Sequence, residues 1–400
     1  MTDKYDKIIS KLDEMSIASR LRRCLRNHSS YCALCLDACP AEAISLVTSE
    51  DARNAPQIDS RICNLCGACA TVCPTGVFKV TEISDEKILL YAEMLSDYTS
   101  DIVFSCSYQV QRVGMIDSAP TIVLPCLARL NEAILVGSAC LDICNIWVNS
   151  AFCKECPNQK VSSLIEERVQ VSQEMLKLYG NTTQIIRTPE QPENLKKKRP
   201  FRKSLPPLTD FEPVSRRGFF EGIRKTLVST GIIVAESELS PFLRDTVNSA
   251  MIEYHLPQKR KSLLQSLKKM EEPPEEKIPV SDFPFFSVRI KNNCSGCESC
   301  VFFCPTQALT KTKTEGCANI EFALALCTKC DLCREVCSDD AIYYEEFFNP
   351  LFLQNGKRKT LISFGRYTCE KCKSEFLSAE SSKLCRYCQK KQATFEPEEP

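Results

Sequence analysis

"CSGCESCVFFC" occupies residues 294–304, and "CTKCDLCREVC" occupies residues 327–337. In each run two residues separate the first three cysteines, and three more precede the fourth. This spacing lets three thiolates bind three irons of one cubane cluster, while the fourth cysteine reaches across to a second cluster. The alternatives are a zinc site or chance pairs of cysteines, but two complete runs in tandem favour iron. The runs predict cluster 3, bound by Cys294, Cys297, Cys300 and Cys337, and cluster 4, bound by Cys304, Cys327, Cys330 and Cys333.

The region around these runs, about 285–348, resembles the bacterial two-cluster ferredoxins. The similarity includes "PTQAL" after the first run and "SDDAI" after the second, although Ser338 stands where proline would follow Cys337. The resemblance implies a pseudo-twofold ββ/α shell around two [4Fe-4S] clusters that transfer single electrons.

A second copy of the pattern lies at about 24–80, in "CALCLDACPAEAI" and "CNLCGACATVCPTGVF". The later run is complete, so cluster 2 has four predicted ligands: Cys39, Cys63, Cys66 and Cys69. The other cluster has Cys32, Cys35 and the crossing Cys73, and it lacks a fourth thiolate because position 29 is serine.

Cys24 is the favoured replacement for the missing ligand. It lies five residues upstream of Ser29, and a longer loop, "LRNHSSY", can bring its sulfur back to the same iron. Thiolate is a better ligand for an iron–sulfur cluster than the alternatives, which are Ser29 as an alkoxide, His28 by nitrogen, or a three-iron cluster. Cluster 1 is therefore predicted at Cys24, Cys32, Cys35 and Cys73.

Between the two copies the chain changes to short apolar runs: "KILLYA", "DIVFSC", "TIVLPC", "NIWVNS" and "TQIIRT". They alternate with helical stretches such as 162–179, which predicts a βαβ domain with a parallel sheet. Ligands of such sheets bind beyond the carboxyl ends of the strands. Cysteines at three such ends are predicted to converge on a possible fifth site, a [2Fe-2S] cluster or another metal: Cys106, Cys126, Cys153 and Cys156.

The cysteines of this region also have an alternative interpretation. Several of them could be buried apolar thiols, since free cysteine packs well in cores. Cys140 and Cys144 precede a strand, so they are expected at the opposite edge of the sheet or in a loop.

Residues 100–180, with "PCLARL" and cysteines at strand ends, resemble the delta subunit of methyl-viologen-reducing hydrogenases. That resemblance implies a [2Fe-2S] cluster and a link between a hydrogenase and a partner reductase.

The last cysteines form a C-x2-C-x12-C-x2-C pattern, which is typical of a zinc ribbon. The predicted zinc ligands are Cys369, Cys372, Cys385 and Cys388. Rubredoxin-type iron is the alternative, but Lys373 and Gln389 stand where rubredoxin turns usually carry glycine.

Together these patterns predict an α+β multidomain protein, with two ferredoxin-like domains flanking an α/β domain and a zinc ribbon at the C-terminal side. The predicted segments are an N-terminal helix (1–23), a ferredoxin-like domain (24–85), the α/β domain (86–187), a linker (188–214), a helical region (215–270), a second linker (271–284), a second ferredoxin-like domain (285–350) and the zinc-ribbon module (360–395).

The composition narrows the function. Lys+Arg and Asp+Glu balance at 51 each, so net charge gives no reason to expect nucleic acid as a partner. Only 2 histidines and 12 glycines are present, with no dinucleotide or phosphate-loop motif. The 27 cysteines, with neither a signal sequence nor an apolar span, predict a reducing cytoplasm. "SRRGFF" at 215–220 matches a twin-arginine export signal but lies far inside the chain, so an ordinary helix is expected.

The predicted function is that of a polyferredoxin-like adapter in anaerobic metabolism, an electron-transfer subunit without catalytic residues of its own. It would pass single electrons between redox partner proteins, from a donor such as a hydrogenase or dehydrogenase to an acceptor enzyme, and it could be an oligomer. One alternative is an iron–sulfur oxidoreductase with a thiol or cluster active site in the α/β domain. Another is a redox or oxygen sensor in which cluster 1 is the labile switch.

Overall fold

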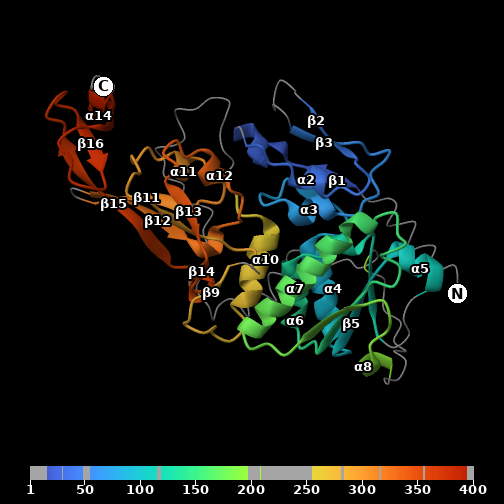
Figure 1. Ribbon diagram of the computed structural model, residues 1–400. Coiled ribbons are helices and arrows are strands. Elements are labelled where there is room, and N and C mark those ends of the chain that lie inside the picture. The colour runs from blue at the N-terminus through green and yellow to red at the C-terminus, as the bar shows by residue number, and fades with distance from the viewer. Residues whose placement is uncertain are drawn as a thin grey trace, which may run out of the picture.

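The computed structural model describes residues 16–28, 30–47, 55–114, 119–196, 208, 255–280, 283–314, 317–354 and 356–393. These residues form a mixed fold of helices and strands that includes a parallel sheet. Figure 1 shows the parallel-sheet domain with one small cysteine-bearing unit against it and a second unit to one side. None of the described helices has the length and apolar character needed to span a membrane.

The central domain is built on four parallel strands in the order β6-β5-β7-β8. Their bounds are β5 (Asp101–Cys106), β6 (Thr121–Leu124), β7 (Asn145–Asn149) and β8 (Gln184–Thr188). β5 and β6 are buried along their whole length, as expected for strands covered on both faces. The predicted parallel sheet is therefore confirmed, with its strands at four of the five predicted apolar runs.

The fifth apolar run, "KILLYA", is a helix and not a strand. It belongs to α4 (Asp85–Ser96), whose N-cap Ser84 accepts a hydrogen bond from the Lys87 amide at 3.2 Å. Its buried apolar side chains follow a helical period at Ile88, Tyr91, Ala92 and Leu95. The prediction was wrong because an apolar run alone does not distinguish the two periods, whereas the cap at Ser84 does.

Helices cover both faces of the sheet. Ile102 and Phe104 share a core with α4, α6 (Glu132–Ala139) and α7 (Ser162–Leu178). Val103 and Trp147 point to the other face, where Leu195 of α8 (Glu193–Lys196) packs against them. α5 (Ser107–Val113) follows β5, and the short helices η3 (Leu127–Arg129) and η4 (Gln159–Val161) follow Cys126 and Cys156.

The first cysteine-bearing unit consists of two antiparallel strand pairs and two short helices. Along the chain they are β1 (Ile17–Ser19), α2 (Leu34–Asp37), β2 (Ile44–Val47), β3 (Ala55–Ile58), α3 (Ala68–Val72) and β4 (Phe78–Val80). β1 pairs with β4, and β2 pairs with β3. The predicted N-terminal helix differs in its described part, because pairing with β4 makes 17–19 a strand, followed by η1 (Leu21–Arg23) and η2 (Leu25–His28).

The second unit repeats this order of elements. It contains β10 (Ser287–Ile290), α11 (Ser299–Phe302), β11 (Leu309–Thr314), β12 (Cys317–Ala323), α12 (Leu332–Glu335) and β13 (Ile342–Glu345). β10 pairs with β13, and β11 pairs with β12, so the pairing matches that of the first unit.

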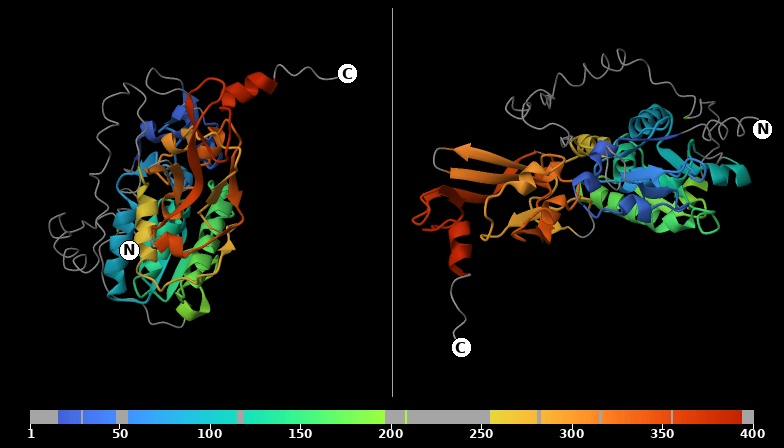
Figure 2. Two further views of the ribbon diagram at one scale, coloured as in Figure 1. Left: turned by 90° about the vertical axis from the view of Figure 1, so that its left-hand side faces the viewer. Right: turned by 90° about the horizontal axis from the view of Figure 1, so that it is seen from above.

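The remaining elements join and extend these parts. α10 (Gln258–Leu267) packs on α6, and Figure 2 shows it where the second unit meets the rest of the molecule. β9 (Ile278–Pro279) pairs with β14 (Phe347–Phe348), and α13 (Leu351–Gln354) contacts α10 and η7 (Leu324–Leu326). β15 (Arg358–Thr368) joins β12 to β16 (Glu375–Ser378), and α14 (Arg386–Ala393) follows.

Several predictions fall outside the described residues. The "SRRGFF" motif and most of the predicted helical region 215–270 belong to that part of the chain, as does most of the linker 188–214. α10 is the described part of the predicted helical region.

Candidate metal centres

The predicted ligands of cluster 1 lie together in the first unit. Cys24 and Cys73 are buried in the same apolar cluster, and Cys35 on α2 packs against it. Burial raises the pKa of Cys24 to about 11, and repulsion by the thiolates of Cys73 and Cys32 adds to the shift. Burial also raises the pKa of Cys35 to about 12, with added repulsion from Cys73, Cys24 and Cys32. The four thiols thus form one mutually interacting group.

The predicted ligands of cluster 2 form a neighbouring group. Burial raises the pKa of Cys66 to about 11, with repulsion from Cys39 and Cys63. Burial also raises the pKa of Cys69, with repulsion from Cys66 and Cys63. The turn between Cys66 and Cys69 depends on Gly67, whose φ of +76° is in the left-handed region.

The second unit holds two equivalent groups. In the first, burial raises the pKa of Cys300 to about 12, and Cys294, Cys337 and Cys297 repel its thiolate. In the second, burial raises the pKa of Cys333, and three other thiolates repel it: Cys327, Cys330 and Cys304. All four thiols of this second group line one pocket with Phe286 and Tyr344.

Hydrogen-bond donors point at the sulfurs of the crossing cysteines in both units. The amides of Ala43, Val77 and Ala341 donate to Cys39, Cys73 and Cys337 at 3.2, 3.3 and 3.3 Å, each from four residues downstream. Such donors stabilise negative charge on sulfur, so they suit thiolates that bind a cluster.

Two other buried donors near the second unit's thiols have no hydrogen-bond partner among the described residues. The hydroxyl of Thr328, directly after Cys327, is buried and accepts or donates no hydrogen bond among the described residues. Nη1 of Arg260 is also buried without an acceptor there, and its guanidinium charge acts on Cys327. Unpaired buried donors beside buried thiols fit an anionic group held at this position. The residues present therefore fit iron–sulfur clusters.

The strand-end cysteines of the central domain also lie together. Cys106, Cys126, Cys153 and Cys156 all line one pocket, with Tyr108 and Phe152 at its wall. Burial raises the pKa of Cys106 to about 11, partly offset by the Gln109 amide, and Cys153 and Cys156 add repulsion. Burial likewise raises the pKa of Cys126.

The sequence interpretation missed one residue that acts on this group of thiols. The positive charge of Arg187, on β8, partly offsets the burial that raises the pKa of Cys153. The same strand-end rule that pointed to the cysteines would have found it. Cys140 lies apart from the pocket and donates to the Ser266 carbonyl oxygen at 3.5 Å, while Cys144 is exposed.

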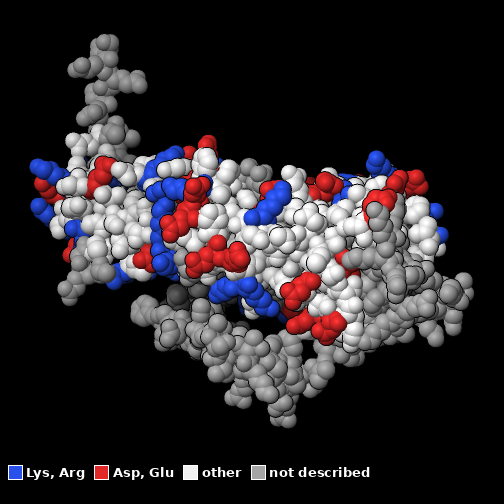
Figure 3. Space-filling view, turned by 90° about the horizontal axis from the view of Figure 1, so that it is seen from below, with Lys and Arg blue, Asp and Glu red and all other residues white. Residues whose placement is uncertain are grey.

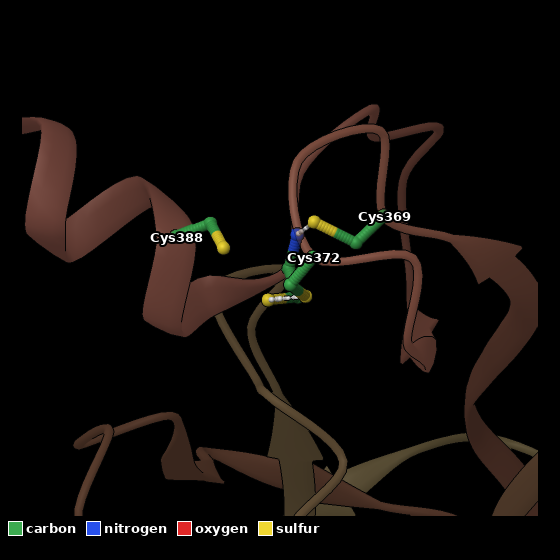
Figure 4. A group of neighbouring side chains, drawn as sticks. Cys369, Cys372 and Cys388 are labelled. Carbon is green, nitrogen blue, oxygen red and sulfur yellow. Dashed lines mark hydrogen bonds between the residues drawn. The ribbon is translucent and has the colours of Figure 1, made fainter.

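The C-terminal cysteines form a compact four-thiol group. Their sulfurs lie within 4.8 Å of one another, so the group could bind a metal ion: Cys369, Cys372, Cys385 and Cys388. Figure 4 shows Cys369 and Cys372 on one loop facing Cys388 on α14. The amides of Cys372 and Cys385 lower the pKa of Cys369, which favours the thiolate that a metal requires.

Comparison with known proteins identifies one part of the chain. Residues 30–77 match the family model of the 4Fe-4S dicluster domain. This segment contains seven of the eight predicted ligands of clusters 1 and 2, with Cys24 upstream of it. No curated protein matches the chain. The chain thus contains a 4Fe-4S dicluster domain. This domain and the many cysteines indicate an iron–sulfur electron-transfer protein, and such a protein needs redox partners.

Proposed function

We propose that this chain is a multi-cluster adapter that carries single electrons between a donor oxidoreductase, such as a hydrogenase or dehydrogenase, and an acceptor enzyme. Clusters 1 to 4 would each be a [4Fe-4S] cluster bound by the cysteines assigned above. Such clusters supply one-electron chemistry, with potentials set by charge, hydrogen bonds and solvent.

The observation that carries this proposal is the contact between the two cysteine-bearing units at their thiol groups. The ring of His28 lies 5.7 Å from the ring of Phe303, the residue before Cys304. The carboxylate of Glu335, between Cys333 and Cys337, repels the thiolate of Cys32. Clusters in the two units would therefore be neighbours, which a path for electrons requires.

The pocket of strand-end cysteines supports a fifth site on the other side of the first unit. The hydroxyl of Thr71 on α3 donates to the Ala128 carbonyl at 2.8 Å, and Asn64 hydrogen-bonds Asn158. The thiolate of Cys66 is close enough to Cys126 to repel it. A [2Fe-2S] cluster or another metal at Cys106, Cys126, Cys153 and Cys156 would then adjoin cluster 2.

Anaerobic analysis of iron, acid-labile sulfide and zinc in the purified full chain tests the proposal. Four cubanes require about 16 iron per chain, and a two-iron centre in the fifth site raises this to about 18. One zinc and no extra iron would support a zinc ribbon at the C-terminal cysteines. Stepwise chemical reduction should then yield one-electron signals from the clusters. A chain without iron and sulfide after anaerobic cluster reconstitution would overturn the proposal.

Cys106→Ala addresses the fifth site separately. This variant should lose about two iron and keep the cubane signals, if the site holds a [2Fe-2S] cluster. Cys144→Ala, which removes an exposed cysteine of the same domain, should lose none. Equal iron in both variants would contradict the fifth site and leave clusters 1 to 4 in place.

The proposed location is the cytoplasm, where reduced thiolates and oxygen-sensitive clusters persist. Figure 3 shows basic and acidic side chains of the described residues interspersed over one face. This mixed charge suits protein redox partners better than nucleic acid, which favours a broadly basic surface.

A further inference from the structure

α10 carries two adjacent cations toward the thiols of both units. It begins after Pro257, and its first turn contains Lys259 and Arg260. Figure 1 shows this helix, in yellow, between the central domain and the second unit, below the first unit. The main-chain amide of His255, just before the helix, donates to the Pro305 carbonyl at 2.7 Å, directly after Cys304.

Lys259 reaches the first unit. Its Nζ donates to the Thr71 carbonyl at 2.6 Å, on α3 between Cys69 and Cys73. Burial lowers the pKa of Lys259, while Glu132 and the thiolate of Cys73 act in the opposite direction. The ammonium group is therefore close to a predicted ligand of cluster 1.

Arg260 reaches the second unit. Its side chain is held by a 2.6 Å hydrogen bond from Nη2 to the Pro284 carbonyl, and its guanidinium carbon lies 4.2 Å from the centre of the Phe285 ring. The residue is only 6% exposed. Burial lowers its pKa to about 10, and the thiolate of Cys327, a predicted ligand of cluster 4, is the first opposing charge.

Among the described residues, little negative charge compensates these two cations. Among the described residues, no carboxylate forms an ion pair with Lys259 or Arg260. Glu132 acts on both cations, and Asp85 acts on Lys259 as well. Each of these carboxylates is already paired with another arginine, Glu132 with Arg168 and Asp85 with Arg129. Burying a cation such as Arg260, or half-burying one such as Lys259, is costly without compensation, so a further anionic group is expected beside them. Cubanes bound by four thiolates are anionic and would supply it.

We propose that Lys259 and Arg260 form the electrostatic junction between the two units, with Lys259 raising the reduction potential of cluster 1 and Arg260 that of cluster 4. This inference rests on the proposed function, because it requires both clusters. Reduction adds one negative charge to a cluster, and a nearby cation stabilises the reduced form more than the oxidised form. The two cations would thereby favour electrons at cluster 1 and at cluster 4.

Redox titration followed by electron paramagnetic resonance tests the junction in the reconstituted full chain. Arg260→Gln should shift the reduction equilibrium of cluster 4 about tenfold toward the oxidised form, or about 59 mV for one electron. Lys259→Met should shift the reduction equilibrium of cluster 1 toward the oxidised form by a similar factor. Signals are assigned from their loss in Cys327→Ala and Cys32→Ala. Lys268→Met, which removes an exposed cation from the end of the same helix, should shift neither cluster.

Two further variants guard against loss of structure. Arg260→Lys and Lys259→Arg keep the charge and should keep the potentials near those of the unmodified chain. Unchanged potentials in Arg260→Gln and Lys259→Met, with full iron content, would overturn the junction while leaving the proposed function intact. An equal shift of all four clusters would also overturn it, because the effect would not be local. Absence of cubane signals in the unmodified chain would instead refute the proposed function.

Discussion

Cys24 shows how a single residue can complete a site that the local motif leaves one thiol short. The matched dicluster segment begins at residue 30, downstream of Cys24. Nevertheless Cys24 is buried, and its thiolate interacts with those of Cys73 and Cys32. Ser29 lies outside the described residues, and the ring of His28 packs near Phe303 of the second unit.

Cys24→Ala is expected to lose one iron if a three-iron cluster forms, and about four if cluster 1 is lost entirely. Iron and sulfide analysis under anaerobic conditions measures the loss. Cys140→Ala is the matched control, because Cys140 is partly buried but bonds only the Ser266 carbonyl. Unchanged iron and an unchanged cluster 1 signal in Cys24→Ala would mean that another residue supplies the fourth ligand.

Gly67 combines two constraints at one position. Its φ of +76° disfavours any side chain, and a Cβ there would lie 2.7 Å from Cδ of Arg129. Gly356 shares the left-handed conformation, with a φ of +63°, but a Cβ at that position would meet no other atom within 4 Å. An alanine at Gly356 would therefore introduce backbone strain alone, whereas an alanine at Gly67 would add a steric conflict.

Gly356→Ala should destabilise the protein by about 1–2 kcal/mol, the usual cost of the left-handed conformation. Gly67→Ala should cost more, because the Arg129 side chain must also move from a buried pair with Asp85. Thermal denaturation of the reconstituted protein compares their midpoints. Equal decreases in the two midpoints would show that the Arg129 side chain moves aside without a measurable loss of stability.

At the scale of elements, β15 links the second unit to the C-terminal four-thiol group. Its first part pairs with β12 from Arg358 to Gly365, and its last part pairs with β16 from Gly365 to Thr368. One strand therefore belongs to both parts. The predicted boundary between 350 and 360 precedes this shared strand, so it does not separate two independent sheets.

Two truncated chains test whether the second unit needs β15 to hold its clusters. A chain ending at Thr368 keeps the β12–β15 pairing and should retain the iron of clusters 3 and 4, while losing the zinc site. A chain ending at Gln354 exposes the edge of β12 and also uncovers the core that Phe364 helps to fill, so it should lose iron from the second unit. Metal analysis of both chains gives the comparison. Equal iron in the two would show that β15 is dispensable to the clusters.

At the scale of the whole molecule, one apolar core runs through several parts of the chain. The same buried cluster includes Cys66 of the first unit, Ile102 of the sheet, Leu267 of α10 and Phe364 of β15. α10 contacts α4, α6 and α13, so it joins the central domain to the second unit. The parts are therefore expected to unfold together.

Leu267→Ala should lower the stability of both the central domain and the second unit by about 2–5 kcal/mol, because Leu267 is fully buried between them. Trp147 is the single tryptophan and reports on the sheet, while visible absorbance reports on the clusters. The two thermal transitions should coincide and shift together. Gln265→Ala, on the exposed side of α10, should shift neither transition. Transitions at different temperatures in Leu267→Ala would contradict a shared core.

Local patterns in the sequence determined the parallel sheet, the dicluster segment and the grouping of the C-terminal cysteines. They could do so because cysteine spacing limits how a short loop wraps a metal, and because buried strands need apolar runs. Ser84 was the overlooked signal that "KILLYA" begins inside a helix. The identity of the donor, acceptor and bound metals remains a prediction.

Only the tertiary structure decided which distant residues meet. Strand β1 forms because β4, about sixty residues later, offers it a pairing edge, and the local pattern of 4–26 favours a helix instead. Likewise, Lys259 and Arg260 follow a proline in a segment without cysteines, and nothing nearby in the chain relates them to Cys73 or Cys327. Packing of α10 on α6 brings them there, since contacts between elements depend on the buried core and not on sequence spacing.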